Sequence, residues 1–326
     1  MNQARSTVSV VGAGHVGAAV ANALVVLREC DQVMLHDRDP VLAEGEAWDI
    51  ADTVPLLSEV EVTPAARYAD LGGCDVVVIA AGVTLRPGQT RLDLLSANAA
   101  TITGIIGELD QVCPGAVVIL VTNPVDVLTR IAIETSAQPA HLILGCGTVL
   151  DGARLQQRLG ELLGVEQESV HAYVIGEHGD SSFPVWSAAT VGAIGLEQFG
   201  LPQGRSWPQV KDELAAAIRR RGRSIHQRKG FTSYGVAAAV ARIVRAITHD
   251  EKRIFMVSVL AARECGIGPV VLGPPCVIGA AGIDRQLLLP MSGEEQQMLR
   301  RSAAVLDRAY RSLAAGGAAT GPGEAR

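Results

Sequence analysis

The feature that most constrains the fold is a glycine pattern between an expected strand and an expected helix near the N-terminus. The apolar stretch TVSVVGAG, residues 7–14, leads into Gly12, Gly14 and Gly17 with the spacing G-x-G-x-x-G, and HVGAAVANALVVLREC follows with helical periodicity. In this context the first glycine permits a tight turn, the second lets a pyrophosphate approach the backbone, and the third lets helix and strand pack closely. The free N–H groups at the start of the helix favour phosphate binding. The pattern therefore predicts a dinucleotide site, and a glycine turn without a ligand is the less favoured alternative.

An acidic residue follows at the position that the ribose of a dinucleotide would reach. The stretch DQVMLHD, residues 31–37, is expected to be the second strand, and Asp37 ends it. A carboxylate there accepts hydrogen bonds from the ribose hydroxyls and repels a 2′-phosphate, which favours NAD over NADP. Arg38 comes next and could attract a 2′-phosphate, so NADP stays open as an alternative. An ordinary loop acid is the other interpretation of Asp37.

Further apolar runs in the first half of the chain predict an α/β fold. CDVVVIAAG, residues 74–82, and AVVILVTNPVD, residues 116–126, are apolar without a break over most of their length. Continuous rather than alternating runs are typical of parallel strands that are buried on both faces. Because helix-patterned stretches such as VLAEGEAWDIAD lie between the strands, we expect a Rossmann-type doubly wound parallel sheet.

The second half of the chain has a different pattern, which predicts a mixed α/β substrate domain. Helices are expected at about 208–226, 233–247 and 294–313, and antiparallel strands within 253–266 and 273–290. The predicted division is a dinucleotide-binding domain at 1–148, a substrate domain at 149–313 and a tail at 314–326. The tail has no large apolar side chain, so we expect it to be disordered.

Composition argues against several functional classes. The 28 basic and 34 acidic residues give a formal net charge of −6, which disfavours a nucleic-acid partner. The apolar runs are far shorter than the roughly 18 residues of a membrane helix, and an apolar strand that starts at Thr7 leaves no room for a signal peptide. The six cysteines form no C-x-x-C pair, which indicates reduced thiols rather than disulfides or a zinc site. We therefore expect a soluble cytoplasmic protein with no bound metal.

Six motifs follow one another along the chain, namely GAGHVG, AGVTLRPGQTRLDLL, VTNPVD, DGARLQ, GEHGDSS and KGFTSYG. With these motifs the sequence resembles the L-lactate/malate dehydrogenase family from Thr7 to about Leu313, and it is most similar to the bacterial L-lactate dehydrogenase branch. The resemblance implies an NAD-dependent oxidoreductase acting on small 2-oxo and 2-hydroxy acids, with pyruvate and L-lactate as the expected pair. It also implies a homo-oligomer, a tetramer in preference to a dimer.

The motifs carry the residues that the family uses for catalysis and substrate binding. His178 in GEHGDSS matches the histidine that gives a proton to the substrate carbonyl, and a side chain that titrates near neutral pH suits that role. Asp151 matches the aspartate that holds the other ring nitrogen. Arg154, one helical turn later, matches the arginine that binds the substrate carboxylate in a bidentate pair, and Arg91 matches the arginine that polarises the carbonyl. A structural histidine, a helix N-cap at Asp151 and a solvated Arg91 are the alternatives.

Other residues match the family's remaining cofactor and substrate contacts. By resemblance, Asn123 contacts the substrate carbonyl with the Asn123–Pro124 bond in the cis form, Thr232 faces the substrate, and Val236 backs the nicotinamide ring. The residues that the resemblance places at the cofactor are Gly12, Gly14, Val16, Gly17, Asp37, Tyr68, Gly82, Val83, Val121, Thr122, Asn123 and Val236. Core packing is an alternative role for several of them, and for Val236 it is nearly as good an explanation.

Three positions depart from the family's usual pattern. Leu85 stands where malate enzymes carry an arginine and many lactate enzymes a glutamine, so a second substrate carboxylate would be desolvated against a hydrocarbon. Gly152 replaces a serine or threonine and leaves a roomier pocket. Gln156 replaces an arginine that, with a histidine matched by His171, binds fructose 1,6-bisphosphate in activated members, so we expect weak or absent activation. Malate dehydrogenase, a dehydrogenase for larger apolar 2-hydroxy acids and a non-catalytic NAD-binding protein are the alternative functions.

Overall fold

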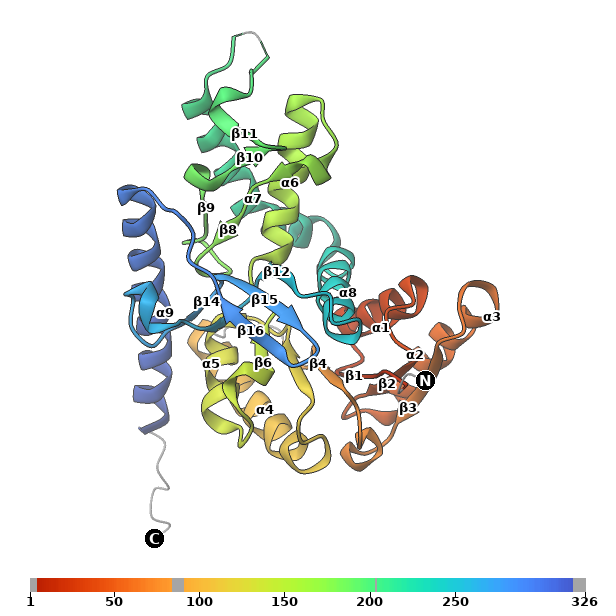
Figure 1. Ribbon diagram of the computed structural model, residues 1–326. Helices are drawn as coiled ribbons and strands as arrows, with labels where there is room; N and C mark the ends of the chain where they lie inside the picture. The colour runs from red at the N-terminus through yellow and green to blue at the C-terminus, as the bar shows by residue number, and fades with distance from the viewer. Residues whose placement is uncertain (1–4, 84–90, 203, 319–326) are drawn as a thin grey trace.

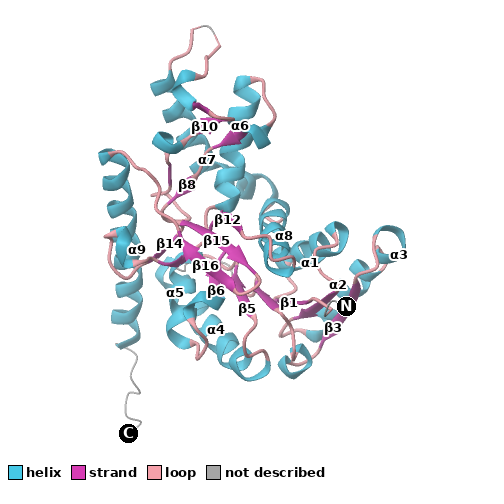
Figure 2. Cartoon of the chain, viewed as in Figure 1, coloured by secondary structure: helices cyan, strands magenta, loops and turns pink. Residues whose placement is uncertain are grey.

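The first half of the chain forms a six-stranded parallel sheet with helices packed along it (Figures 1 and 2). The computed structural model describes residues 5–83, 91–202 and 204–318. The strands are β1 (Thr7–Val11), β2 (Gln32–His36), β3 (Glu61–Ala65), β4 (Val76–Ile79), β5 (Val117–Leu120) and β6 (Ile143–Gly145). Their order is β3-β2-β1-β4-β5-β6, and every neighbouring pair is parallel. The Rossmann-type prediction is confirmed, and the strand order reverses between β1 and β4, where such sheets open a ligand crevice.

Burial explains which strands could be predicted from the sequence. β4 (VVVI) and β5 (VVIL) are buried along their whole length, as continuous apolar runs in the middle of a sheet should be. The edge strands β3 and β6 were not predicted. β3 contains Pro64 and is mostly exposed or half-buried, and β6 has only three residues, so neither gives a long apolar signal.

Helices connect the strands of the sheet. They are α1 (His15–Leu27), α2 (Pro40–Ala51), α3 (Val54–Leu57), α4 (Arg91–Val112) and α5 (Val125–Thr135). α1 starts directly after the glycine pattern. α2 starts after Asp39, whose carboxylate accepts hydrogen bonds from the N–H groups of Val41 and Leu42 and so caps the helix.

The second half of the chain combines helices with short antiparallel strands (Figure 1). The helices are α6 (Val149–Leu163), α7 (Trp207–Lys229), α8 (Tyr234–Thr248) and α9 (Gly293–Ala318). The strands are β7 (Val170–His171), β8 (Val174–Ile175), β9 (Phe183–Pro184), β10 (Thr190–Val191), β11 (Ile194–Gly195), β12 (Arg253–Met256), β13 (Val259–Leu260), β14 (Val271–Leu272), β15 (Pro275–Gly279) and β16 (Gly282–Gln286). As predicted, β12, β15 and β16 form an antiparallel sheet. The mixed α/β character of this half is therefore confirmed.

The C-terminal helix is longer than predicted. α9 continues to Ala318, five residues beyond the end that was expected for this helix at 313. Alanine has the highest helix propensity, and the segment AAGGA offers three alanines to extend the helix. Residues 319–326 of the expected tail lie outside the described part of the chain.

One large buried core joins the two halves. Val240 and Val244 of α8 belong to the same apolar cluster as Val20 and Leu24 of α1, because α8 packs against α1. A second, smaller cluster lies between α6, α7 and the short strands around β7. Within the described residues, no helix is long and apolar enough to cross a membrane, and no group of three or more metal-ligating side chains occurs.

Candidate active site

The three glycines of the N-terminal pattern have different surroundings. Gly12 has φ +104°, and a Cβ atom there would lie 2.5 Å from the backbone nitrogen of Ala81. A Cβ atom at Gly17 would lie 1.7 Å from the Gly12 oxygen, so both glycines are required by the packing of the protein itself. Gly14 differs, because a Cβ atom there would meet no atom within 4 Å. The open space beside Gly14 fits the close approach of a dinucleotide pyrophosphate at the start of α1.

Asp37 lies beside this glycine loop. Its Oδ2 accepts a hydrogen bond of 2.7 Å from the N–H of Ala13, and its Oδ1 accepts one of 3.0 Å from the N–H of Asp39. The carboxylate is therefore held at the carboxyl end of β2, where an adenosine ribose would lie in this fold. Tyr68 begins a short helical turn three residues after the neighbouring strand β3, and its ring lies 4.4 Å from that of the buried His36.

The ends of β4 and β5 are held together by a residue that sequence analysis missed. The Asn98 side chain accepts a hydrogen bond of 2.8 Å from the Val83 N–H and donates one of 3.0 Å to the Asn123 carbonyl. A Cβ atom at Gly82 would lie 2.5 Å from the Thr122 side chain, so this contact also requires glycine. Four predicted residues thus lie together around Asn98, and the Asn123–Pro124 bond is cis, as predicted.

Asp151 holds two of the predicted functional side chains at once. Its Oδ2 lies 2.8 Å from Nδ1 of His178, and its Oδ1 accepts a hydrogen bond of 3.0 Å from Nη1 of Arg154. Asp151 and Arg154 share one face of α6, and His178 comes from the segment after β8. The carboxylate is buried, whereas the His178 side chain is 27% exposed, so the imidazole can reach a ligand in the cavity.

A second buried carboxylate, Asp126, also contacts His178 and was not predicted. Its Oδ2 accepts a hydrogen bond of 2.7 Å from the His178 backbone N–H, and its Oδ1 accepts one of 2.6 Å from the Ser258 hydroxyl. Burial raises the pKa of Asp126 to about 6. Burial lowers the pKa of His178, but the hydrogen bond and charge of Asp151, with the charge of Asp126, outweigh it and leave that pKa above its ordinary value. The surroundings therefore favour the imidazolium form of His178 more than water does.

A cavity of about 360 Å³ brings most of the predicted substrate and nicotinamide residues together. The predicted residues that line it are Val16, Val121, Asn123, Asp151, Arg154, His178, Thr232 and Val236. Leu85 lies outside the described residues, and Arg91 is described only as the first residue of α4, without its side chain. α7 adds two cations that were not predicted, Arg219, which donates to the Ser182 carbonyl at 3.3 Å, and Arg223, which lies 3.4 Å from Asp180.

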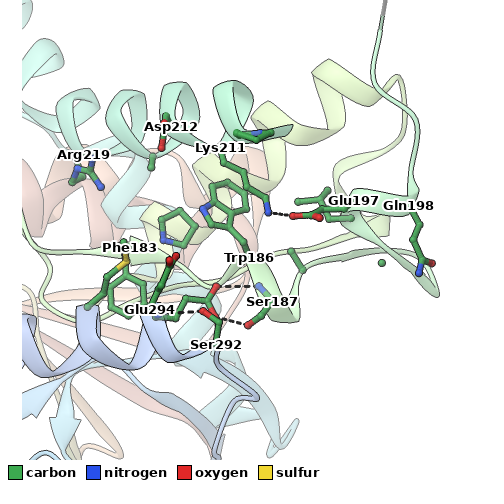
Figure 3. Close-up of a pocket in the computed structure, with 18 residues that line it drawn as sticks. Phe183, Trp186, Ser187, Glu197, Gln198, Lys211, Asp212, Arg219, Ser292 and Glu294 are labelled. Atoms are coloured by element: carbon green, nitrogen blue, oxygen red, sulfur yellow. Dashed lines mark hydrogen bonds and ion pairs between the residues drawn. The ribbon is translucent and has the colours of Figure 1, made fainter. Parts of the chain in front are cut away.

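A larger cavity of about 680 Å³ is lined by the first part of α7, from Pro208 to Arg219, and holds none of the predicted site residues (Figure 3). Trp186 and an ion pair between Lys211 and Glu197 line it, and the buried Glu295 accepts hydrogen bonds there from Ser187. Arg219 lines both cavities. Since the glycine loop, the Asp151–His178 pair and Arg154 are all elsewhere, we assign the candidate active site to the smaller cavity.

Comparisons with known proteins identify relatives along nearly the whole chain. Residues 6–145 match the family model of the lactate/malate dehydrogenase NAD binding domain, and residues 148–315 match that of the alpha/beta C-terminal domain. An L-lactate dehydrogenase of Thermus aquaticus is 42% identical over 94% of this chain and 99% of its own. One from Moorella thermoacetica is 39% identical over 95% and 98%.

Solved structures show the same relationship. A lactate dehydrogenase from a Medee basin deep-sea metagenome library superimposes with a TM-score of 0.90 at 32% identity, covering 95% of this chain and 99% of its own. The minor L-lactate dehydrogenase of Enterococcus mundtii superimposes with a TM-score of 0.91 at 30% identity, with the same coverage. The sheet order, the glycine loop and these matches together show that the chain belongs to the lactate/malate dehydrogenase family of NAD-dependent oxidoreductases.

Proposed function

We propose that the protein is an L-lactate dehydrogenase, which reduces pyruvate to L-lactate and catalyses the reverse reaction. The observation that carries the proposal is the arrangement of Asp151, His178 and Arg154 in one cavity, next to residues assigned to the nicotinamide. Two of the relatives named above are L-lactate dehydrogenases, and this chain matches nearly their whole length. Bound NADH supplies the hydride, and the side chains of the cavity bind the acid and supply the proton.

His178 acts as the proton donor in this proposal. Asp151 accepts the Nδ1–H of its ring, which fixes the tautomer and leaves Nε2 as the nitrogen that serves the substrate. The raised pKa of His178 increases the fraction of the ring that is protonated before pyruvate binds. Nε2 then gives its proton to the carbonyl oxygen of pyruvate and recovers one from the hydroxyl of L-lactate in the reverse direction.

Arg154 binds the carboxylate that all 2-oxo acids share. Its Nη1 is engaged with Asp151, but a guanidinium carries five N–H donors, so a fork of two remains available for a bidentate pair. The contact with Asp151 restricts the rotation of the arginine, so less side-chain entropy is lost when the carboxylate binds. Lysine could not reproduce the paired geometry.

Leu85 and Arg91 complete the proposed substrate site. From the family resemblance alone, we propose that Arg91 polarises the carbonyl and that Leu85 faces the variable end of the substrate. A methyl group would bind there without the desolvation penalty that a second carboxylate would meet. The test is NADH oxidation with pyruvate, oxaloacetate and a branched 2-oxo acid. We expect the highest kcat/KM with pyruvate. Leu85→Arg should raise kcat/KM for oxaloacetate and lower it for pyruvate, whereas Leu85→Met should preserve the order.

Oxaloacetate reduction is a second candidate activity, because Arg219 and Arg223 place positive charge on the α7 wall of the cavity. If a second carboxylate binds there, Arg223→Gln should lower kcat/KM for oxaloacetate much more than for pyruvate. Arg220→Gln is the matched control, since Arg220 is exposed on the same helix and does not line the cavity. A wild-type preference for oxaloacetate would overturn the pyruvate assignment.

We also propose a homo-oligomer, a tetramer in preference to a dimer, that works in the cytoplasm. Large apolar side chains are exposed on α2 and α3, namely Val41 (75%), Trp48 (61%) and Leu56 (83%), and an exposed apolar face of this kind favours self-association. We also propose that the dinucleotide-binding domain ends at residue 148 and that the substrate domain begins at 149, where α6 starts. Light scattering should give a multiple of 34.1 kDa, and Trp48→Glu should reduce it. A monomeric wild type would contradict the oligomer.

A further inference from the structure

Two buried cysteines on different elements lie in direct contact. The Cys74 thiol, just before β4, lies 3.1 Å from the sulfur of Cys113, the residue that follows α4. They are 39 positions apart in the sequence, and both are nearly inaccessible to solvent. Cys113 in turn lies 3.1 Å from the Leu71 carbonyl. Neither cysteine belongs to a C-x-x-C motif, so it is the fold that brings the two sulfur atoms together.

We propose that Cys74 and Cys113 form an intramolecular disulfide when the folded protein meets a small peroxide. The sulfur atoms need to approach by about 1 Å to reach bonding distance, which small shifts of the turn before β4 can provide. The hydrogen bond from Cys74 lowers the pKa of Cys113, and the same contact with burial raises the pKa of Cys74, so Cys113 ionises first. Since the thiolate is the reactive form, Cys113 is the sulfur that attacks.

The reaction balances with hydrogen peroxide as the oxidant. The Cys113 thiolate attacks one peroxide oxygen, the O–O bond breaks, and a sulfenic acid and hydroxide form. The Cys74 sulfur then attacks the sulfenic sulfur, the S–O bond breaks, and water leaves. The thiol protons end in water, so two thiols and one peroxide give one disulfide and two waters. A thiol reductant reverses the change.

The bond would lie far from the reacting atoms. It would close a ring that contains β4 and all of α4, whose first residue is the proposed carbonyl-polarising Arg91. α4 has 22 residues, so about 33 Å of helix separates Arg91 from Cys113. We therefore expect kcat/KM for pyruvate to change less than about twofold. Closing a ring of this size removes entropy from the unfolded chain and should raise the midpoint of thermal unfolding by about 5 °C.

The other cysteines serve as internal controls. Burial raises the pKa of Cys146, which lines the active-site cavity, and of Cys276, in each case to about 12, so both resist peroxide. Cys265 is the half-buried thiol among the six and is the one a peroxide reaches most directly. Removing it with Cys265→Ser should leave the Cys74–Cys113 disulfide unaffected.

The experiment uses the folded full-length protein, treated with hydrogen peroxide, then unfolded and alkylated. We expect the treated chain to take up four labels instead of six, and trypsin to release peptides 68–91 and 92–130 joined by a disulfide. Cys113→Ala and Cys74→Ala should each abolish the joined peptides and the rise in the unfolding midpoint, and a reductant should reverse both in the wild type. A disulfide between other cysteines, one that forms only after unfolding in urea, or none at doses that oxidise Cys265 would overturn the proposal. Because mass and unfolding are read without substrate, the result does not depend on the proposed activity.

Discussion

Replacing Asp126 with asparagine tests the electrostatics of the carboxylate beneath His178. Asp126 is only 2% exposed, and burial raises its pKa from 3.8 in the unfolded chain to about 6 in the folded protein. The folded protein therefore binds more protons than the unfolded chain in this window. Its free energy of unfolding should fall as the pH rises from about 3.8 to about 6, because the ionised form is the one that folding disfavours.

The size of the effect follows from the two pKa values. One pKa unit corresponds to about 1.4 kcal/mol, so the carboxylate costs about 1.6 kcal/mol of stability at pH 5 and about 3 kcal/mol at pH 8. The asparagine side chain of the variant would not titrate and would avoid this cost, while the loss of hydrogen-bond strength to His178 and Ser258 acts equally at both pH values. The stability of Asp126→Asn relative to wild type should thus improve by roughly 1.4 kcal/mol between pH 5 and pH 8.

Urea unfolding of both proteins at pH 5 and pH 8 measures this difference, with Asp49→Asn, an exposed position on α2, as the control. The same variant should shift the basic limb of the pyruvate reduction profile to lower pH, because the charge of Asp126 contributes to the raised pKa of His178. An equal stability difference at both pH values, together with an unshifted basic limb, would refute the reasoning.

Three further predictions concern the cofactor, the proton donor and regulation. Gly14→Ala should fold with wild-type stability but raise the Kd for NADH at least tenfold in fluorescence titration. Gly12→Ala should instead lower the midpoint of thermal unfolding, because Gly12 has a φ of +104°. Asp151→Asn should lower kcat for pyruvate by roughly 10²-fold and also raise KM in steady-state assays, because the carboxylate holds both the proton donor and the carboxylate-binding arginine. Fructose 1,6-bisphosphate should leave KM for pyruvate almost unchanged in the wild type, and Gln156→Arg should introduce a response that depends on His171, an exposed residue of β7.

The central part of the fold was predictable because its signals are local. β1, β4 and β5 are apolar runs that a parallel sheet buries on both faces, and Gly12 and Gly17 sit where only a glycine fits. The edge strands gave no such signal. The positions of β3 and β6 depend on their pairing with β2 and β5. A short or proline-containing segment carries no sequence pattern that predicts such pairing.

The residues missed in the site are those whose role depends on distant contacts. Asp126 meets the His178 backbone 52 positions away and Ser258 132 positions away, and Asn98 meets Asn123 25 positions away. A lone buried Asp or Asn within an apolar stretch is a signal that could have found them, because a buried polar group requires partners. Arg219 and Arg223 belong to the run RRRGR, which is typical of a solvated helix face, and only the packing of α7 shows that the two of them line the cavity.

The position of His178 follows from the sheet rather than from its own segment. β5 and β6 are parallel neighbours, and each is followed by a helix that carries a carboxylate in its first turn, Asp126 in α5 and Asp151 in α6. Asp126 holds the backbone of His178, and Asp151 holds its ring. Two separate carboxylates therefore fix the backbone and the ring of the histidine, and Asp151 also fixes Arg154. A segment from the second half of the chain thereby acquires its orientation from the carboxyl edge of the parallel sheet, which is where the strand order of this fold also places the nicotinamide.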